Sequence, residues 1–222
     1  MRRFVVAIDG PSGAGKSAVA KAVAHEIHGF HLDTGAMYRA LGLCMADMGV
    51  DLDDPAEIAA RLSGIRIDVR FEDGAQHVFA NDCDYTPRLR TEKGSVSASK
   101  VSAVPEVRSY LVAAQRLLAR SESVVMDGRD IGTVVLPDAD LKIFLTASDE
   151  ERAKRRYLQN LEKGIDDSLE TVLAQIRERD ARDASRAASP LAKAEDAVEL
   201  DSSDMTEAEV IEAVLRMVRE RM

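Results

Sequence analysis

A glycine-rich segment near the start of the chain has the residue types and spacing of a phosphate-binding loop. Residues 10–17 read Gly-Pro-Ser-Gly-Ala-Gly-Lys-Ser, which fits the pattern G-x-x-x-x-G-K-[ST]. Glycines let backbone N–H groups curl around phosphate oxygens, and the helix that follows points its positive end at the anion. We expect Lys16 to neutralise the β- and γ-phosphates of a nucleoside triphosphate and the Ser17 hydroxyl to bind Mg²⁺. The expected triphosphate-binding residues are Gly10, Pro11, Ser12, Gly13, Ala14, Gly15, Lys16 and Ser17.

Two further polar groups follow short apolar runs. Residues 33–39 read Asp-Thr-Gly-Ala-Met-Tyr-Arg, and residues 127–130 read Asp-Gly-Arg-Asp. In open α/β sheets the carboxyl ends of the strands face the ligand crevice, so these groups are candidate ligand contacts. The alternatives are an ordinary helix start, with Thr34 as the cap and Asp33 favoured by the helix dipole, and a solvated Asp–Arg turn.

A third group lies near the end of a charged helix. Arg179, Asp183 and Arg186 are four and three residues apart, so a helix places them on one face. They are candidates for binding phosphate or sugar. A surface helix laced with salt bridges, to which Glu178 and Asp180 would contribute, is the alternative.

The elements that would position these residues alternate between strand and helix. Residues 4–9 form a continuous apolar, β-branched run, which is typical of a strand buried on both faces of a parallel sheet. Further strands are predicted at 30–33, 124–127, 141–145 and 197–200, and helices at 16–28, 36–48, 55–62, 106–119, 149–163, 168–186 and 206–220. This alternation predicts an α/β fold with a parallel sheet.

Residues 63–90 break the pattern. Residues 65–71 alternate between apolar and polar side chains, 72–74 read Glu-Asp-Gly, and 76–80 form a returning strand. This is the signature of an antiparallel hairpin. Such a hairpin does not belong in a parallel core, so we interpret this segment as an insert.

Composition and charge narrow the class of protein. The 222 residues include 45% hydrophobic and 31% charged residues, and the net charge is −9. A chain this acidic is a poor candidate for coating nucleic acid. No apolar run approaches the roughly 20 residues that span a bilayer, and the stretch before Asp9 is too short for a signal peptide. The two cysteines, Cys44 and Cys83, lack metal-ligand spacing, so we expect a cytosolic protein without membrane association.

Known GTPase signatures are missing from the sequence. Neither the guanine-reading string Asn-Lys-x-Asp nor the γ-phosphate sensor Asp-x-x-Gly occurs. This weighs against a molecular switch and favours a small kinase. Two alternatives stay open: another P-loop kinase of UMP and CMP or of a small metabolite, and a non-enzymatic nucleotide-binding module.

Four motifs, taken in order, resemble those of bacterial cytidylate kinases. They are residues 10–16, residues 33–39, residues 127–133 (Asp-Gly-Arg-Asp-Ile-Gly-Thr) and residues 178–183 (Glu-Arg-Asp-Ala-Arg-Asp). The resemblance covers essentially the whole chain, including the hairpin insert. It implies one nucleoside monophosphate kinase domain over residues 1–222, with a five-stranded parallel core, a small antiparallel insert at 63–90 and a helical lid at 152–166. The implied activity is transfer of the γ-phosphoryl group of ATP to CMP or dCMP.

The resemblance also assigns roles to individual residues. Ser99, Arg108 and Asp127 would read cytosine, whose edge offers both a donor and an acceptor. Thr34, Asp130, Arg179 and Asp183 would surround the sugar. Arg39, Arg129 and Arg186 would hold phosphate, with Arg186 also a candidate neighbour of the base, and with Lys16 they would stabilise the transferring group. Arg152, Arg155 and Arg156 of the lid would close over ATP.

The implied mechanism needs no general base, because a phosphate monoester is mostly dianionic at pH 7. Positioning and charge stabilisation then supply the catalysis, and lid closure excludes water. The implied partners are ATP with Mg²⁺ and CMP or dCMP, and we expect a monomer that binds neither nucleic acid nor membranes. The carboxylate that supports Mg²⁺ is left open, with Asp33 as a candidate through water.

Three features are given ordinary interpretations. His25, His28 and His31 are expected to be surface and helix-end residues rather than a metal site. The acidic run at 51–54 lacks EF-hand spacing and is expected to be a solvated loop. Cys44 is expected to be a small core residue.

Overall fold

The computed structural model describes residues 2–72, 74–120, 122–162, 164–186 and 189–222. The chain divides into two compact units. The first unit comprises Met1–His31 and Glu122–Met222, and the second comprises Leu32–Ser121.

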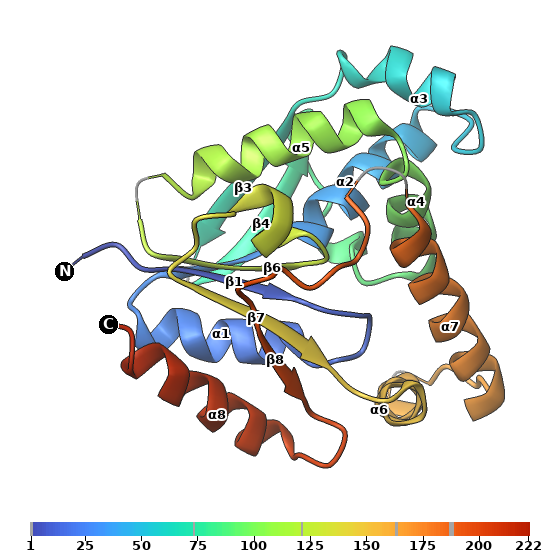
Figure 1. Ribbon diagram of the computed structural model, residues 1–222. Helices are drawn as coiled ribbons and strands as arrows, with labels where there is room; N and C mark the ends of the chain where they lie inside the picture. Colours follow the sequence, from blue (N-terminus) through green and yellow to red (C-terminus); the bar gives the residue numbers. More distant parts are fainter. Residues whose placement is uncertain (1, 73, 121, 163, 187–188) are drawn as a thin grey trace. The chain divides into compact units, whose positions relative to one another are not determined.

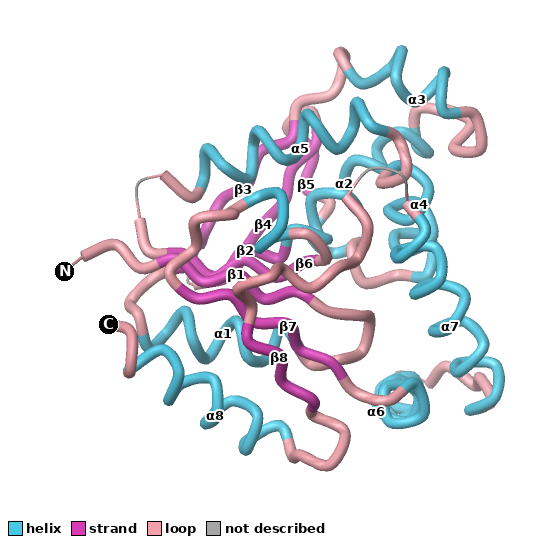
Figure 2. The backbone as a smooth tube through the Cα atoms, viewed as in Figure 1, coloured by secondary structure: helices cyan, strands magenta, loops and turns pink. Residues whose placement is uncertain are grey.

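The first unit is built on a five-stranded parallel sheet with the strand order β2-β6-β1-β7-β8 (Figures 1 and 2). The strands are β1 Val5–Asp9, β2 Phe30–Asp33, β6 Val124–Gly128, β7 Leu141–Thr146 and β8 Val198–Asp201. β1 lies at the centre, and all five of its residues are buried, as its uninterrupted apolar sequence predicts. In the register of β1 and β6, Asp9 lies opposite Gly128, so both strands end at the same edge.

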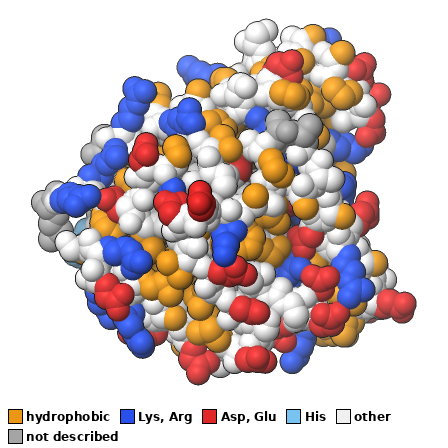
Figure 3. Space-filling view, viewed as in Figure 1, with side chains coloured by type: hydrophobic (Ala, Val, Ile, Leu, Met, Phe, Trp, Pro, Cys, Tyr) orange, Lys and Arg blue, Asp and Glu red, His pale blue; other side chains and the backbone are white. Residues whose placement is uncertain are grey.

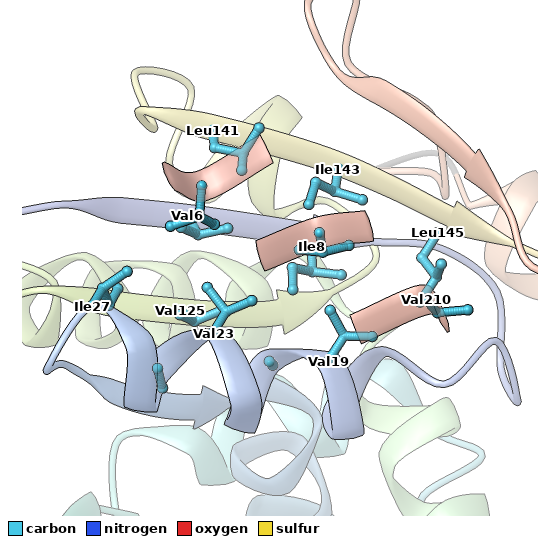
Figure 4. Packing of buried hydrophobic residues seen from close by; sticks show 14 of the residues in the cluster. Val6, Ile8, Val19, Val23, Ile27, Val125, Leu141, Ile143, Leu145 and Val210 are labelled. Carbon is cyan, nitrogen blue, oxygen red and sulfur yellow. The ribbon is translucent and has the colours of Figure 1, made fainter. Parts of the chain in front are cut away.

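Helices α1 (Lys16–Glu26) and α8 (Glu207–Arg219) pack together against one face of this sheet (Figures 1 and 4). Val6 and Ile8 of β1 meet Val19 and Val23 of α1, and Val210 adds the contribution of α8. Burial of each such side chain stabilises the fold by about 1.5–3 kcal/mol. This packing fixes β1 and α1, the two elements that the glycine-rich loop connects.

Two charged helices and a short π-helix complete the first unit. The helices are α6 (Asp149–Glu162) and α7 (Leu169–Ser185), which share a small apolar cluster of Ala153, Val172 and Ile176. The π-helix spans Ile131–Val135, directly after the Asp-Gly-Arg-Asp motif. Short π-helical turns are rare and are often found at functional sites.

The second unit combines four helices with a small antiparallel sheet of order β3-β4-β5. Its elements are α2 Thr34–Asp47, α3 Pro55–Leu62, β3 Ile67–Glu72, β4 Ala75–Ala80, β5 Cys83–Asp84, the 3-10 turn Thr86–Arg88, α4 Glu92–Val101 and α5 Pro105–Leu118. Helices α2 and α4 cross closely at Gly42, where an added Cβ would lie 2.8 Å from the Ser97 carbonyl carbon.

The predicted fold class is confirmed, with three differences in detail. The hairpin gains a third short strand, β5, and helix α4 was not predicted. Helix α2 begins at Thr34 rather than Ala36, because Asp33 is its cap and accepts a hydrogen bond from Ala36 N at 3.0 Å. The alternative in which Thr34 caps this helix is therefore wrong.

Some predictions lie outside what the structure tests. Asp73 of the predicted turn and Lys163 of the predicted α6–α7 junction fall outside the described residues. The bounds of the insert, 63–90, and of the lid, 152–166, stay predictions. No helix in the described parts of the chain is long and apolar enough to cross a membrane.

Candidate functional site

The phosphate-binding loop connects β1 to α1 as the motif predicts. Gly10 has φ +144°, and a Cβ at this position would lie 1.9 Å from the carbonyl oxygen of Leu145, so only glycine fits. Gly15 caps α1 in the left-handed conformation, at φ +91°, without a side-chain hydrogen bond. The first N–H groups of α1 are therefore left available to an anion, which is the arrangement a phosphate requires.

Lys16 lies buried at the start of α1, within reach of other cations. Its side chain is only 7% exposed, and Nζ donates to the Pro11 carbonyl at 2.7 Å. Burial and the nearby charges of Arg129 and Arg179 together lower the pKa of Lys16 to about 7, although the carboxylates of Asp127 and Asp9 oppose this shift. A bound anion beside Lys16 would offset both the desolvation of its ammonium and the repulsion from the two arginines.

Arg129 is held at the end of β6 by Asp183 of α7. The guanidinium Nε donates to Asp183 Oδ2 at 2.8 Å, and Arg186 NH2 lies 3.7 Å from the other carboxylate oxygen. Burial alone would raise the pKa of Asp183, but the charges of Arg129 and Arg186 outweigh burial and hold the pKa below its usual value. Asp183 therefore stays ionised and contacts two arginines, of which only Arg186 belongs to the group predicted to share one helix face.

The turn that carries Arg129 and Asp130 is fixed by Asp9, a residue the sequence analysis did not single out. Asp9 ends β1, and its carboxylate accepts hydrogen bonds from Ile131 N at 2.8 Å and Gly132 N at 2.7 Å. Burial raises the pKa of Asp9 to about 6, against the opposing effect of these two hydrogen bonds. Asp9 thus connects the residue before the phosphate-binding loop to the turn beside it, where Asp130 is also buried.

Ser17 and Asp127 meet beside the loop. The Ser17 hydroxyl donates to Asp127 Oδ2 at 3.1 Å, and His31 Nε2 lies 2.6 Å from Asp127 Oδ1. Burial opposes ionisation of Asp127, but hydrogen bonds and charge from His31, together with Lys16, lower its pKa. The expectation that His31 is a surface residue is wrong, since its side chain is 12% exposed and contacts Asp127. His25 and His28 are exposed, as expected.

In the second unit, Asp33 and Arg39 form an ion pair at the start of α2. Arg39 NH2 donates to Asp33 Oδ2 at 2.6 Å, and both side chains are 17% exposed. Arg39 Nε is buried and has no hydrogen-bond partner among the described residues. Thr34 is buried beside them at the first position of the helix. A buried guanidinium with an unused donor is suited to bind an added anion.

Ser99 and Arg108, both predicted to read a base, are linked through Ser102. The Ser102 hydroxyl donates to the Ser99 carbonyl at 3.0 Å, and Arg108 NH1 lies 3.5 Å from the Ser102 carbonyl. The Arg108 guanidinium also lies 5.6 Å from the centre of the Tyr38 ring and is buried. The structure therefore brings these two residues of α4 and α5 together, beside an aromatic ring.

The three arginines of the predicted lid differ in burial and in hydrogen-bond partners. Arg152 is buried, and its NH1 donates to the Ser12 carbonyl of the phosphate-binding loop at 2.9 Å and to Asp180 at 2.5 Å. Arg155 donates to the hydroxyl and carbonyl of Ser202 at 3.1 and 2.6 Å, which ties α6 to the end of β8. Arg156 is exposed. Arg152 and Arg155 are thus structural ties here, and closure of any of the three over ATP stays a prediction.

The acidic run at 51–54 and Cys44 have the settings expected of a loop and of a core residue. Among the described residues, no cluster of three or more His, Cys, Asp or Glu side chains is placed to hold a metal ion. Asp51 and Asp53 are joined by a loop hydrogen bond of 2.9 Å, and Asp54 caps α3. Cys44 is buried and unpaired with another cysteine, as expected of a core residue.

Comparisons with known proteins agree with this geometry. The sequence model of the family described as cytidylate kinase matches residues 6–220. A cytidylate kinase from Halalkalibacterium halodurans is 46% identical over 222 residues, which is 100% of both chains. One from Rhodococcus jostii is 47% identical over 220 residues, covering 99% of this chain and 96% of the relative. A crystal structure of an uncharacterized protein from Eubacterium ventriosum has a TM-score of 0.53 at 14% identity, covers 99% and 100% of the two chains, and is similar in fold alone. The chain belongs to the cytidylate kinase family.

Proposed function

We propose that this protein transfers the γ-phosphoryl group of ATP to CMP or dCMP, giving ADP and CDP or dCDP. Family membership over nearly the whole chain supports the reaction. The observation that carries the proposal is the group of cations Lys16, Arg129 and Arg179 around the phosphate-binding loop. The positive charge of such a group is suited to the negative charge of a transferring phosphoryl group.

The donor nucleotide is assigned to the loop. Backbone N–H groups of the loop, where Pro11 alone has none, and the Lys16 ammonium would hold the β- and γ-phosphates. Arg152 would keep the loop in shape through the Ser12 carbonyl. Arg155 and Arg156 are assigned to the lid over ATP. For Arg155 this requires that its bonds to Ser202 be exchanged for bonds to the nucleotide.

Candidate contacts of the acceptor are proposed for each unit separately. In the second unit, Ser99 and Arg108 supply hydrogen bonds suited to the cytosine edge, Thr34 contacts the sugar, and Arg39 binds the phosphate through its unused Nε. In the first unit the set is Arg129, Asp130, Arg179, Asp183 and Arg186. The resemblance motivates these roles, and the ion pairs around Asp183 support the pre-organisation of its arginines.

Asp127 receives a different role from the one the resemblance implied. Its two carboxylate oxygens are engaged by Ser17 and His31, which suits a metal-supporting carboxylate better than a base-reading one. Hydroxyl and carboxylate oxygens are the ligands that Mg²⁺ prefers, so the residues present fit this ion. We propose that Ser17 and Asp127 hold Mg²⁺, whose charge would neutralise the phosphates. Asp33 is the weaker candidate, since Ala36 N and Arg39 already engage its oxygens.

In this mechanism the protein contributes the positioning of the two substrates and the stabilisation of negative charge. An oxygen of the dianionic CMP phosphate attacks the γ-phosphorus of ATP, the bond to the β,γ-bridging oxygen breaks, and ADP leaves with that electron pair. In the first unit, Lys16, Arg129 and Arg186 would stabilise the charge of the transferring phosphoryl group. In the second unit, Arg39 would bind the acceptor phosphate. Closure of the lid at 152–166 would exclude water and so prevent hydrolysis of ATP.

A coupled assay of ADP release tests the proposal with CMP, dCMP, UMP and AMP as acceptors. The expected order places CMP and dCMP first. Preference for UMP or for a small metabolite would favour the other kinase, and ATP binding without ADP release would favour a non-enzymatic module. The net charge of −9 argues against an RNA-binding role, and acidic and basic side chains are interspersed on the face shown in Figure 3.

We further propose that residues 1–222 act as one kinase domain with the insert and lid bounds given above, working as a monomer in the cytosol. Both cysteines, buried Cys44 and exposed Cys83, are free thiols, which supports a reducing compartment. Light scattering with and without nucleotides would test the monomer.

A further inference from the structure

The side-chain amide of Gln76 is paired with the main chain of Asp33. Asp33 N donates to Gln76 Oε1 at 2.7 Å, and Gln76 Nε2 donates to the Asp33 carbonyl at 3.2 Å. One amide group thus satisfies both the donor and the acceptor of one backbone residue. Gln76 lies in β4, near the turn of the small antiparallel sheet, whereas Asp33 ends β2 and caps α2.

Asp33 passes this constraint on to Arg39. With its main chain held by Gln76, the Asp33 side chain accepts from Ala36 N at 3.0 Å through Oδ1 and from Arg39 NH2 at 2.6 Å through Oδ2. Both carboxylate oxygens are therefore in use, and the ion pair fixes the direction of the guanidinium. The chain of contacts runs from the small sheet through Asp33 to a cation with an unused buried donor.

We propose that Gln76 is a positioning residue for the acceptor nucleotide, and that the small antiparallel sheet helps to set CMP affinity by orienting Arg39 through Asp33. The proposal rests on the proposed function, because it takes Arg39 as a contact of the acceptor phosphate. Gln76 itself touches neither substrate in this account. A guanidinium displaced by about 1 Å loses much of a directional bond to phosphate, so a remote anchor has a measurable effect.

The sheet has other attachments, so loss of the Gln76 amide need not release it. Ile67 N donates to the Tyr110 hydroxyl at 3.0 Å, and Tyr85 and Arg88 both donate to Asp47 of α2, at 3.1 Å and 2.5 Å. These contacts join the sheet and the turn after it to α5 and α2. A variant at Gln76 is therefore expected to fold and to change the local orientation of Asp33.

Calorimetric titration of Gln76→Met with CMP and with ATP tests the proposal. Methionine has a similar length but neither donor nor acceptor. We expect the Kd for CMP to rise about tenfold, which corresponds to about 1.4 kcal/mol and to the loss of one or two modest hydrogen bonds. The Kd for ATP should stay within about twofold of the wild-type value, which is clearly smaller than the tenfold change expected for CMP.

The neighbouring variant His77→Met is the matched control, because successive side chains of a strand point to opposite faces. It should bind CMP as wild type does. Equal weakening by both variants would show a general disturbance of the sheet and would overturn the proposal. If Gln76→Met fails to fold, Gln76→Glu retains the acceptor for Asp33 N and should weaken CMP binding; unchanged binding would overturn the proposal.

A double-mutant cycle tests whether Gln76 acts through Arg39. In an Arg39→Met background, Gln76→Met should have no further effect on the Kd for CMP. A full tenfold effect in that background would refute transmission through Arg39. If wild-type protein does not bind CMP at all, the proposed function fails; if it does and Gln76→Met matches it, only this inference fails.

Discussion

The buried carboxylate of Asp9 makes a pH-dependent contribution to stability that its replacement by asparagine should remove. In the wild-type protein Asp9 is 4% exposed and accepts from Ile131 N and Gly132 N. Asparagine keeps the shape but offers one acceptor where two are used. Relative to the ionised wild type, the Asp9→Asn variant therefore loses one hydrogen bond, which costs about 1–3 kcal/mol.

The sign of the pH dependence follows from the raised pKa. Burial raises the pKa of Asp9 from 3.8 to about 6, so between these values the folded state holds a proton that the unfolded state has lost. The free energy of unfolding of the wild type consequently falls as the pH rises through this window, by about 3 kcal/mol in total. Between pH 5 and pH 7.5 the fall amounts to about 1.4 kcal/mol. Asparagine does not titrate and makes no such contribution.

Urea unfolding of both proteins at a series of pH values measures this effect directly. The difference in unfolding free energy, wild type minus Asp9→Asn, should fall by about 1.4 kcal/mol from pH 5 to pH 7.5. Taking the difference cancels the titration of all groups that the two proteins share. A difference that stays constant or grows with pH would refute the raised pKa of Asp9 and its physical cause.

Three other substitutions test the site and the packing. Arg129→Met should lower kcat by about 10³-fold, as for other arginines that bind the transferring phosphate. Its melting temperature should fall only slightly, because Arg186 still neutralises Asp183. Wild-type turnover would show that Arg129 is not part of the site. Gly42→Ala should destabilise the fold by about 1–3 kcal/mol, because the added Cβ would lie 2.8 Å from the Ser97 main chain. If urea unfolding shows that the variant is more stable than wild type, the helix propensity of alanine outweighs this clash. Thr206→Ala breaks the capping box of α8 and should cost about 1 kcal/mol, so an unchanged urea midpoint would contradict the role of the cap.

Most elements of the fold could be predicted from local sequence patterns. The strands β1, β6 and β7 were predictable because each contains a short, nearly unbroken apolar run. The hairpin was predictable because its side chains alternate. Helix α4 escaped prediction because Glu92–Val101 is rich in serine and lacks a clear apolar stripe, although Thr91 supplies an ordinary cap. The order of the strands depends on pairing between distant segments, which no local pattern encodes.

The parts of the site missed by sequence reasoning depend on long-range contacts. Asp9 reaches the N–H of a residue 122 positions away, and His31 reaches Asp127 across 96 positions. Gln76 looks like any polar residue of a hairpin. The one available signal was the position of Asp9 at the end of a buried strand, where a carboxylate needs a partner. The phosphate-binding loop could be predicted because all the residues of its motif are consecutive in the sequence.

The central claim is direct transfer of a phosphoryl group from ATP to a cytidine monophosphate, and isotope labelling tests it most directly. ATP carrying ¹⁸O in the three non-bridging oxygens of its γ-phosphate would be incubated with CMP, Mg²⁺ and the protein. Mass spectrometry should find the labelled phosphoryl group as the β-phosphate of CDP. Label recovered only in inorganic phosphate, with no labelled CDP, would contradict the account.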